Sequence, residues 1–137
     1  MGLYLCVFSQ SGDELEGVEV GHYDDFGVFR DAVSDVIEKR SSTPCPVLIN
    51  HSDCDGEWTS CEANELLVEL IRIDEIMRQY PPIEFNSEWK RDVARTYGIR
   101  PKTLHDCFFD VDGESLLERL QQLVKVSINT NQPILFQ

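Results

Sequence analysis

The segment 59–80 constrains the fold most strongly, because it combines a helix start, an apolar stripe and a helix stop. Thr59 and Glu62 match a capping box, in which each side chain accepts a hydrogen bond from a free backbone N–H. Pro81 and Pro82 end the pattern, because proline has no backbone N–H to continue a helix. Apolar residues recur at helical spacing in between: Leu66, Leu67, Leu70, Ile71, Ile73, Ile76, Met77 and Tyr80. The chain must therefore bury one face of a long helix.

Three further segments have helical periodicity, namely 24–40, 86–98 and 114–127. The expected caps are Asp24 or Asp25 for the first segment, and Asn86 or Ser87 with a terminal Gly98 for the second. Together with the helix at 59–80, these segments predict several helices that pack on a common core.

Short apolar segments predict a small sheet. Residues 2–9 are apolar on both faces and predict a central strand, while 18–23 predicts an edge strand joined to it as a hairpin. Further strands are expected at 46–50, 104–111 and 133–136, where Pro133 indicates a strand start or a sheet edge. This order predicts one α+β domain over 1–137, with a small, mostly antiparallel sheet packed against three or four helices.

The charge balance limits the partners. The chain carries 25 acidic against 12 basic residues, a net charge of −13. Phosphates would be repelled, so we expect neither nucleic acid nor an anionic membrane as a partner, whereas a basic protein would be attracted. Solubility alone is the competing explanation of the acidity.

The cysteines and the N-terminus predict a cytoplasmic protein. Five cysteines, at 6, 45, 54, 61 and 107, form no paired framework and suit a reducing compartment. The start MGLYLCVFSQSGDE has no basic segment of the kind that opens a signal peptide.

The stretch HSDCDGEW at 51–58 concentrates polar chemistry and admits a metal site as one interpretation. Cys45, His51, Cys54 and Cys61 could supply zinc ligands, but their spacing lacks the close pairs of structural zinc sites. The pattern Asp-x-Asp-Gly-Glu occurs at 53–57 and again at 110–114, and neither copy has the glutamate that a calcium loop requires at its twelfth position. Turn formation before a helix explains both copies more simply, so we expect no metal and no other cofactor.

No catalytic signature is present. The chain lacks the motifs of serine hydrolases, zinc peptidases, nucleotide-binding loops and dinucleotide-binding folds. We therefore expect no enzymatic activity and assign no catalytic residue, with a metal-dependent enzyme centred on 51–57 as the alternative.

The remaining interpretation of the loop is a protein interface. Asp53, Asp55 and Glu57 surround Trp58, and an aromatic ring flanked by acids suits a basic partner. Trp58 could equally pack under the loop as part of the core. The second choice for partner contacts is the acidic turn that contains Asp13, Glu14 and Glu16.

The opening MGLYLCVFSQSGDELEGVEVGHYDDFGVFRDAV, together with HSDCDGEW, resembles the immunity protein 70 family of bacterial polymorphic toxin systems. The resemblance implies an α+β, cytoplasmic, non-enzymatic protein. Such a protein binds and blocks the toxin domain encoded beside it. An acidic inhibitor suits a basic toxin, such as a nuclease.

Overall fold

The computed structural model describes residues 2–52, 56–85 and 87–137. Its elements are β1 (Gly2–Phe8), β2 (Glu14–His22), α1 (Tyr23–Lys39), α2 (Pro46–Ile49), β3 (Glu57–Trp58), α3 (Ser60–Met77), α4 (Glu88–Tyr97), the 3₁₀ helix η1 (Leu104–Cys107), α5 (Leu116–Thr130) and β4 (Ile134–Phe136). One antiparallel sheet is combined with helices, so the predicted α+β class is confirmed. Among the described residues, no helix is both long and apolar enough to cross a bilayer.

The sheet has four strands in the order β2-β1-β4-β3, and every neighbouring pair is antiparallel. The predicted hairpin is confirmed: β1 lies inside the sheet and β2 lies at its edge. Pro133 was expected to mark either the start of a strand or a sheet edge. The last strand, β4, does begin just after Pro133, but it lies between β1 and β3 and not at an edge. The sequence pattern did not predict β3, which is two residues long.

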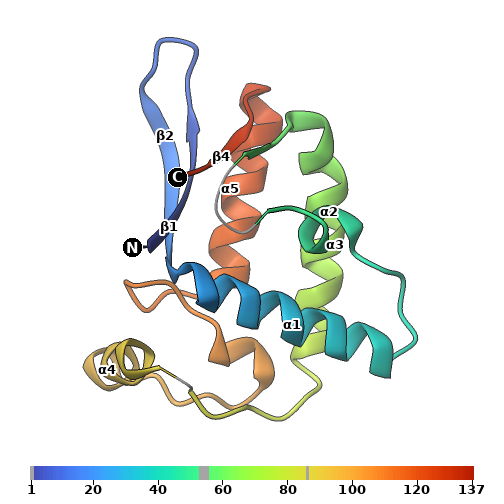
Figure 1. Ribbon diagram of the computed structural model, residues 1–137, viewed down its shortest axis with the longest axis vertical. Coiled ribbons are helices and arrows are strands. Elements are labelled where there is room, and N and C mark those ends of the chain that lie inside the picture. The colour runs from blue at the N-terminus through green and yellow to red at the C-terminus, as the bar shows by residue number, and fades with distance from the viewer. Residues whose placement is uncertain (1, 53–55, 86) are drawn as a thin grey trace.

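Three helices supply most of the helical side of the core. α5 runs beside α3, and α1 crosses in front of both (Figure 1). Most of the predicted stripe of α3 is buried, with Leu66, Leu70 and Met77 at most 1% exposed. Ile71 departs from the prediction, since 44% of its surface is exposed.

The strand expected at 46–50 is wrong, because Pro46–Ile49 form the short helix α2. The carboxylate of Glu69 on α3 accepts hydrogen bonds from the N–H groups of Val47 (3.2 Å) and Leu48 (3.0 Å). These are free N–H groups of the first helical turn, which need a partner when they are buried. A side chain on another helix therefore stabilises a turn that local sequence does not favour.

The strand expected at 104–111 is also wrong. Residues Leu104–Cys107 form η1, and the carboxylate of Asp106 accepts hydrogen bonds from the N–H groups of Lys102 (3.0 Å) and Thr103 (3.3 Å). These bonds hold the turn closed, which explains why the alternating apolar residues do not extend into a strand.

The helix boundaries follow the predictions closely, with one change of cap. Thr59 Oγ1 accepts from the Glu62 N–H at 3.1 Å, so the predicted capping box is confirmed. α4 ends at Gly98, whose φ of 66° is the left-handed conformation that favours glycine. α1 is capped by His22 and not by Asp24 or Asp25, and the Asp25 carboxylate accepts from the His22 N–H at 3.0 Å.

Candidate partner-binding surface

The loop that follows α2 is anchored at its base. Arg30 of α1 donates to the carbonyl oxygens of His51 (2.5 Å) and Ile49 (3.4 Å). The His51 ring stacks on Phe136 with ring centroids 4.2 Å apart, and its Nδ1 and Nε2 lie 2.8 Å and 2.9 Å from the carbonyl oxygens of Ser52 and Glu57. The predicted contact residues Asp53 and Asp55 lie outside the described residues. The described residue His51 is thus held to α1 by Arg30 and to the sheet by Phe136 and Glu57.

Trp58 belongs to the core, so the expectation that its ring faces a partner is corrected. The side chain is 1% exposed, and its indole N–H donates to the Val47 carbonyl oxygen at 3.0 Å. Its ring packs edge-on against Phe136 with centroids 4.7 Å apart. Pairing of β3 with β4 turns Trp58 inward, because successive residues of a strand point to opposite faces.

Glu57 precedes Trp58 on β3, and its side chain is exposed on the surface. The same alternation that buries Trp58 leaves Glu57 on the outer side. Glu57 is therefore accessible to a partner.

The acids of the β1–β2 turn are partly used within the chain. Glu14 accepts a hydrogen bond from the Tyr4 hydroxyl at 2.7 Å, which together with burial raises the pKa of Tyr4 to about 12. Glu16 lies 3.6 Å from the guanidinium of Arg119. Asp13 is exposed and accepts from the Ser11 hydroxyl at 3.2 Å. Asp13 and Glu14 are exposed, and Asp13 is bonded to a neighbour in the turn rather than to a distant residue.

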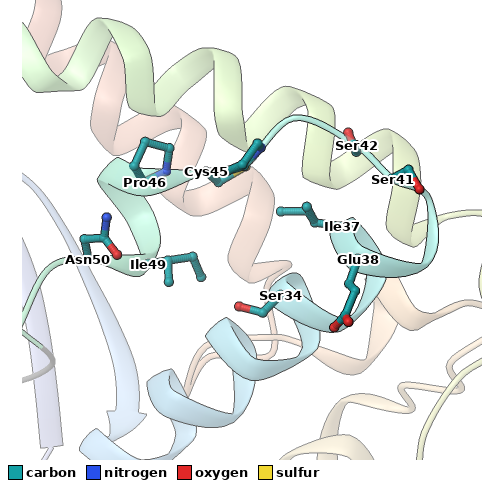
Figure 2. Close-up of a pocket in the computed structure, with 10 residues that line it drawn as sticks. Ser34, Ile37, Glu38, Ser41, Ser42, Cys45, Pro46, Ile49 and Asn50 are labelled. Atoms are coloured by element: carbon teal, nitrogen blue, oxygen red, sulfur yellow. The ribbon is translucent and has the colours of Figure 1, made fainter.

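An apolar cavity of about 450 Å³ lies between the C-terminal half of α1 and α2, next to Asn50 at the start of the 51–58 loop. Ile37 of α1 and Ile49 of α2 project into the space between the two helices, and Glu38 and Asn50 lie at its sides (Figure 2). The sequence pattern does not reveal this cavity, because the composition of 46–50 predicts a buried strand there. The usable signal was the segment SSTPCP, whose two prolines prevent a regular connection between α1 and the next element.

Two of the four residues considered as zinc ligands, His51 and Cys45, are engaged or buried within the chain, and Cys54 lies outside the described residues. Both ring nitrogens of His51 face carbonyl oxygens, and Cys45 is 2% exposed. Burial, followed by the charge of Glu69, raises the pKa of the Cys45 thiol to about 11, which disfavours the thiolate that binds zinc. Across 2–52, 56–85 and 87–137, no group of three or more possible ligands is gathered at one point.

The second Asp-x-Asp-Gly-Glu copy forms a capped turn. Asp110 is 1% exposed, and its Oδ1 accepts hydrogen bonds from the N–H groups of Asp112 (2.9 Å) and Glu114 (3.0 Å). Arg119 Nε lies 3.4 Å from Asp110 Oδ2 and neutralises its charge. At this copy, turn formation explains the pattern.

A polar cluster around His105 has the order of groups found in serine hydrolases. Ser115 Oγ lies 3.3 Å from His105 Nε2, and Asp106 Oδ1 lies 3.2 Å from Nδ1. The same Nε2 also lies 3.2 Å from both Arg78 Nη2 and Asp74 Oδ1. Ser115 in turn caps α5 by accepting the Glu118 N–H at 3.4 Å. These contacts join α3, η1 and α5, so the cluster has a structural role.

A small α+β fold with an apolar cavity beside exposed carboxylates has the features of a protein-binding domain. The sequence model of the family described as Immunity protein 70 matches residues 3–136, and the chain belongs to this family. The resemblance found in the first half of the sequence is therefore confirmed over nearly the whole chain. No curated protein and no solved structure matches the chain significantly.

Proposed function

We propose that the chain binds and neutralises the toxin encoded beside it in a bacterial polymorphic toxin system, in the cytoplasm of the producing cell. The observation that carries this proposal is the match of residues 3–136 to the Immunity protein 70 family. The net charge of −13 favours a basic toxin, since opposite charge speeds the encounter of two proteins. A nuclease meets this requirement, because its substrate cleft must be positively charged to hold phosphates.

The acids of the 51–58 loop are the contacts that we propose first. Glu57 is exposed, and the loop follows directly on Ile49 and Asn50, which line the apolar cavity. Asp53 and Asp55 are the other two acids proposed as contacts, with Asp13 at the β1–β2 turn as the second contact region. Trp58 supports the loop from beneath.

Co-expression tests the function directly. We expect the toxin gene that neighbours this chain to arrest growth when it is expressed alone, and growth to be restored when both genes are expressed together. Continued arrest, with both proteins detected in the cell, would refute the immunity function.

Charge reversal tests the surface. We expect Glu57→Lys, and more so the triple change with Asp53→Lys and Asp55→Lys, to slow association with the toxin, by a factor that shrinks as salt is raised. Glu84→Lys is the matched control, because Glu84 is an exposed acid outside this loop, in a hollow that Arg91 of α4 also lines. Equal association rates for the loop and control variants would exclude the loop as a contact region.

A further inference from the structure

We propose that the toxin is held chiefly by an apolar patch on the outer face of α3, formed by Val68 and Ile71 together with Pro44 and Pro46 (the α3 patch). The partner chemistry that fits it is a large apolar side chain flanked by lysine or arginine on the toxin surface. This inference rests on the proposed function and adds the anchor that the acidic loop lacks, since Trp58 is buried.

The two α3 residues are unusually exposed for their type. Val68 is 57% exposed and Ile71 is 44% exposed, while Leu66 and Leu70 on the same helix are at most 1% exposed. Residues three apart in a helix are surface neighbours, so Val68 and Ile71 form one apolar spot. Stable interfaces are centred on such apolar anchors, which charged loops alone do not provide.

The spot borders a hollow that a partner side chain can enter. A cavity of about 360 Å³ lies between Val68 and the prolines Pro44 and Pro46. The same two prolines line the 450 Å³ cavity between α1 and α2. The apolar surface therefore continues from α3, across the loop before α2, as far as Ile49 and Asn50.

The exposed charges around the α3 patch are mostly acidic. One cation, Arg72, also lines the 360 Å³ cavity, and its Nη1 donates to the Thr43 carbonyl oxygen at 3.1 Å. Glu65 and Glu75 are exposed on the same face of α3, one turn before Val68 and one turn after Ile71. Glu38 lines the adjoining cavity. An apolar centre with an acidic border matches a toxin whose anchor is bordered by cations.

The other exposed apolar residues fit a basic toxin less well. Ile83 lines a hollow together with Glu84 and Arg91, and Tyr97 lies on α4 close in sequence to Arg95 and Arg100. Acids do not outnumber cations at these places as they do around the α3 patch, so a basic surface is attracted less strongly. Leu15 stands between Glu14 and Glu16, whose carboxylates are bonded to Tyr4 and Arg119 within the chain.

The test measures the affinity of the full-length chain for the purified toxin domain, made with an inactivating substitution so that it can be produced. We expect Val68→Asp and Ile71→Asp each to weaken the complex by roughly tenfold or more, and Val68→Ala to weaken it less, because a desolvated anchor contributes most of its energy through burial. Glu65→Lys should weaken it in a salt-dependent way. Leu15→Asp and Ile83→Asp are the matched controls, at 44% and 47% exposure.

The outcomes separate this inference from the proposed function. If the wild-type chain binds the toxin and the Val68 and Ile71 variants bind equally well, with unchanged unfolding midpoints, the α3 patch is refuted and the function stands. If Ile83→Asp or Leu15→Asp is the damaging change, the anchor lies elsewhere and the inference is wrong. If the wild-type chain does not bind, both proposals fail. If the chain alone sediments as a dimer that Val68→Asp dissociates, the patch serves self-association and the inference is overturned.

Discussion

Replacing Glu69 with alanine tests how α2 is held in place. Glu69 is 5% exposed, and its carboxylate accepts the N–H groups of Val47 and Leu48 at 3.2 Å and 3.0 Å. A hydrogen bond to a charged group contributes roughly 1.5–3 kcal/mol, and a buried N–H left without a partner carries a penalty of similar size. Burial raises the pKa of Glu69, so holding the charged form in the core is itself unfavourable and offsets part of this gain. We therefore expect Glu69→Ala to lower the free energy of unfolding by roughly 2–4 kcal/mol.

Urea unfolding followed by circular dichroism measures this loss, with Glu65→Ala as the control one helical turn away. Glu65 is exposed, so its substitution should change the free energy of unfolding by no more than about 0.5 kcal/mol. A change of no more than about 0.5 kcal/mol in the free energy of unfolding of Glu69→Ala would show that the carboxylate does not stabilise α2.

The pH dependence of the same experiment has a defined sign. The pKa of Glu69 is raised in the folded chain above its usual 4.5, so the folded state binds the proton more tightly than the unfolded state. The stability that Glu69 contributes is then greatest below pH 4.5 and falls as the pH rises through the raised pKa. The difference between wild type and Glu69→Ala should accordingly be larger at pH 4 than at pH 7. A difference that grows with pH would contradict the assigned direction.

Three further outcomes are expected. Trp58→Phe should lower the free energy of unfolding by roughly 2–3 kcal/mol, because it leaves a gap in the core and removes the N–H that donates to the Val47 carbonyl oxygen. The affinity of the folded variant for the toxin should stay unchanged. Weaker toxin binding without a loss of stability would show that Trp58 is a contact residue after all. Asp106→Ala should lower it by about 1 kcal/mol at pH 7 through loss of the cap on η1. Although burial acts to raise the pKa of Asp106, hydrogen bonds from the Lys102 N–H and the His105 ring lower it, so the urea-measured difference should shrink as the pH falls below 3.8. Elemental analysis should find no stoichiometric metal in the purified protein, and a chelator should not shift its melting temperature. Stoichiometric metal, or a lower melting temperature with chelator, would favour the metal-binding alternative for 51–57.

The elements that sequence predicted well are those whose determinants lie close together in the chain. Thr59 and Glu62 specify the start of α3 within four residues, and Gly98 ends α4 by its own conformational freedom. The hairpin of β1 and β2 is equally local, since a short turn joins its strands. In each case one or two neighbouring side chains determine the backbone.

The elements that were predicted wrongly depend on distant side chains. PVLIN has the composition of a strand, and it forms a helix because Glu69 supplies acceptors from α3. The burial of Trp58 depends on Phe136 and on the Val47 carbonyl oxygen, neither of which its neighbours in sequence reveal. The cavity beside α2 depends on both features, so local patterns alone could not predict it.

The position of β4 determines when the protein can fold. Residues Ile134–Phe136 pair with β1 on one side and with β3 on the other, so the sheet joins the first and last strands of the chain directly. During synthesis, the β1–β2 hairpin leaves the ribosome early, but β4, which pairs with β1 on its other side, is synthesised only after nearly the whole chain. Contacts between segments so far apart form slowly, because a long loop must close first. The complete sheet can therefore form only after translation has passed Phe136. If the proposed function holds, an inhibitor translated ahead of its toxin, or in excess over it, has an advantage.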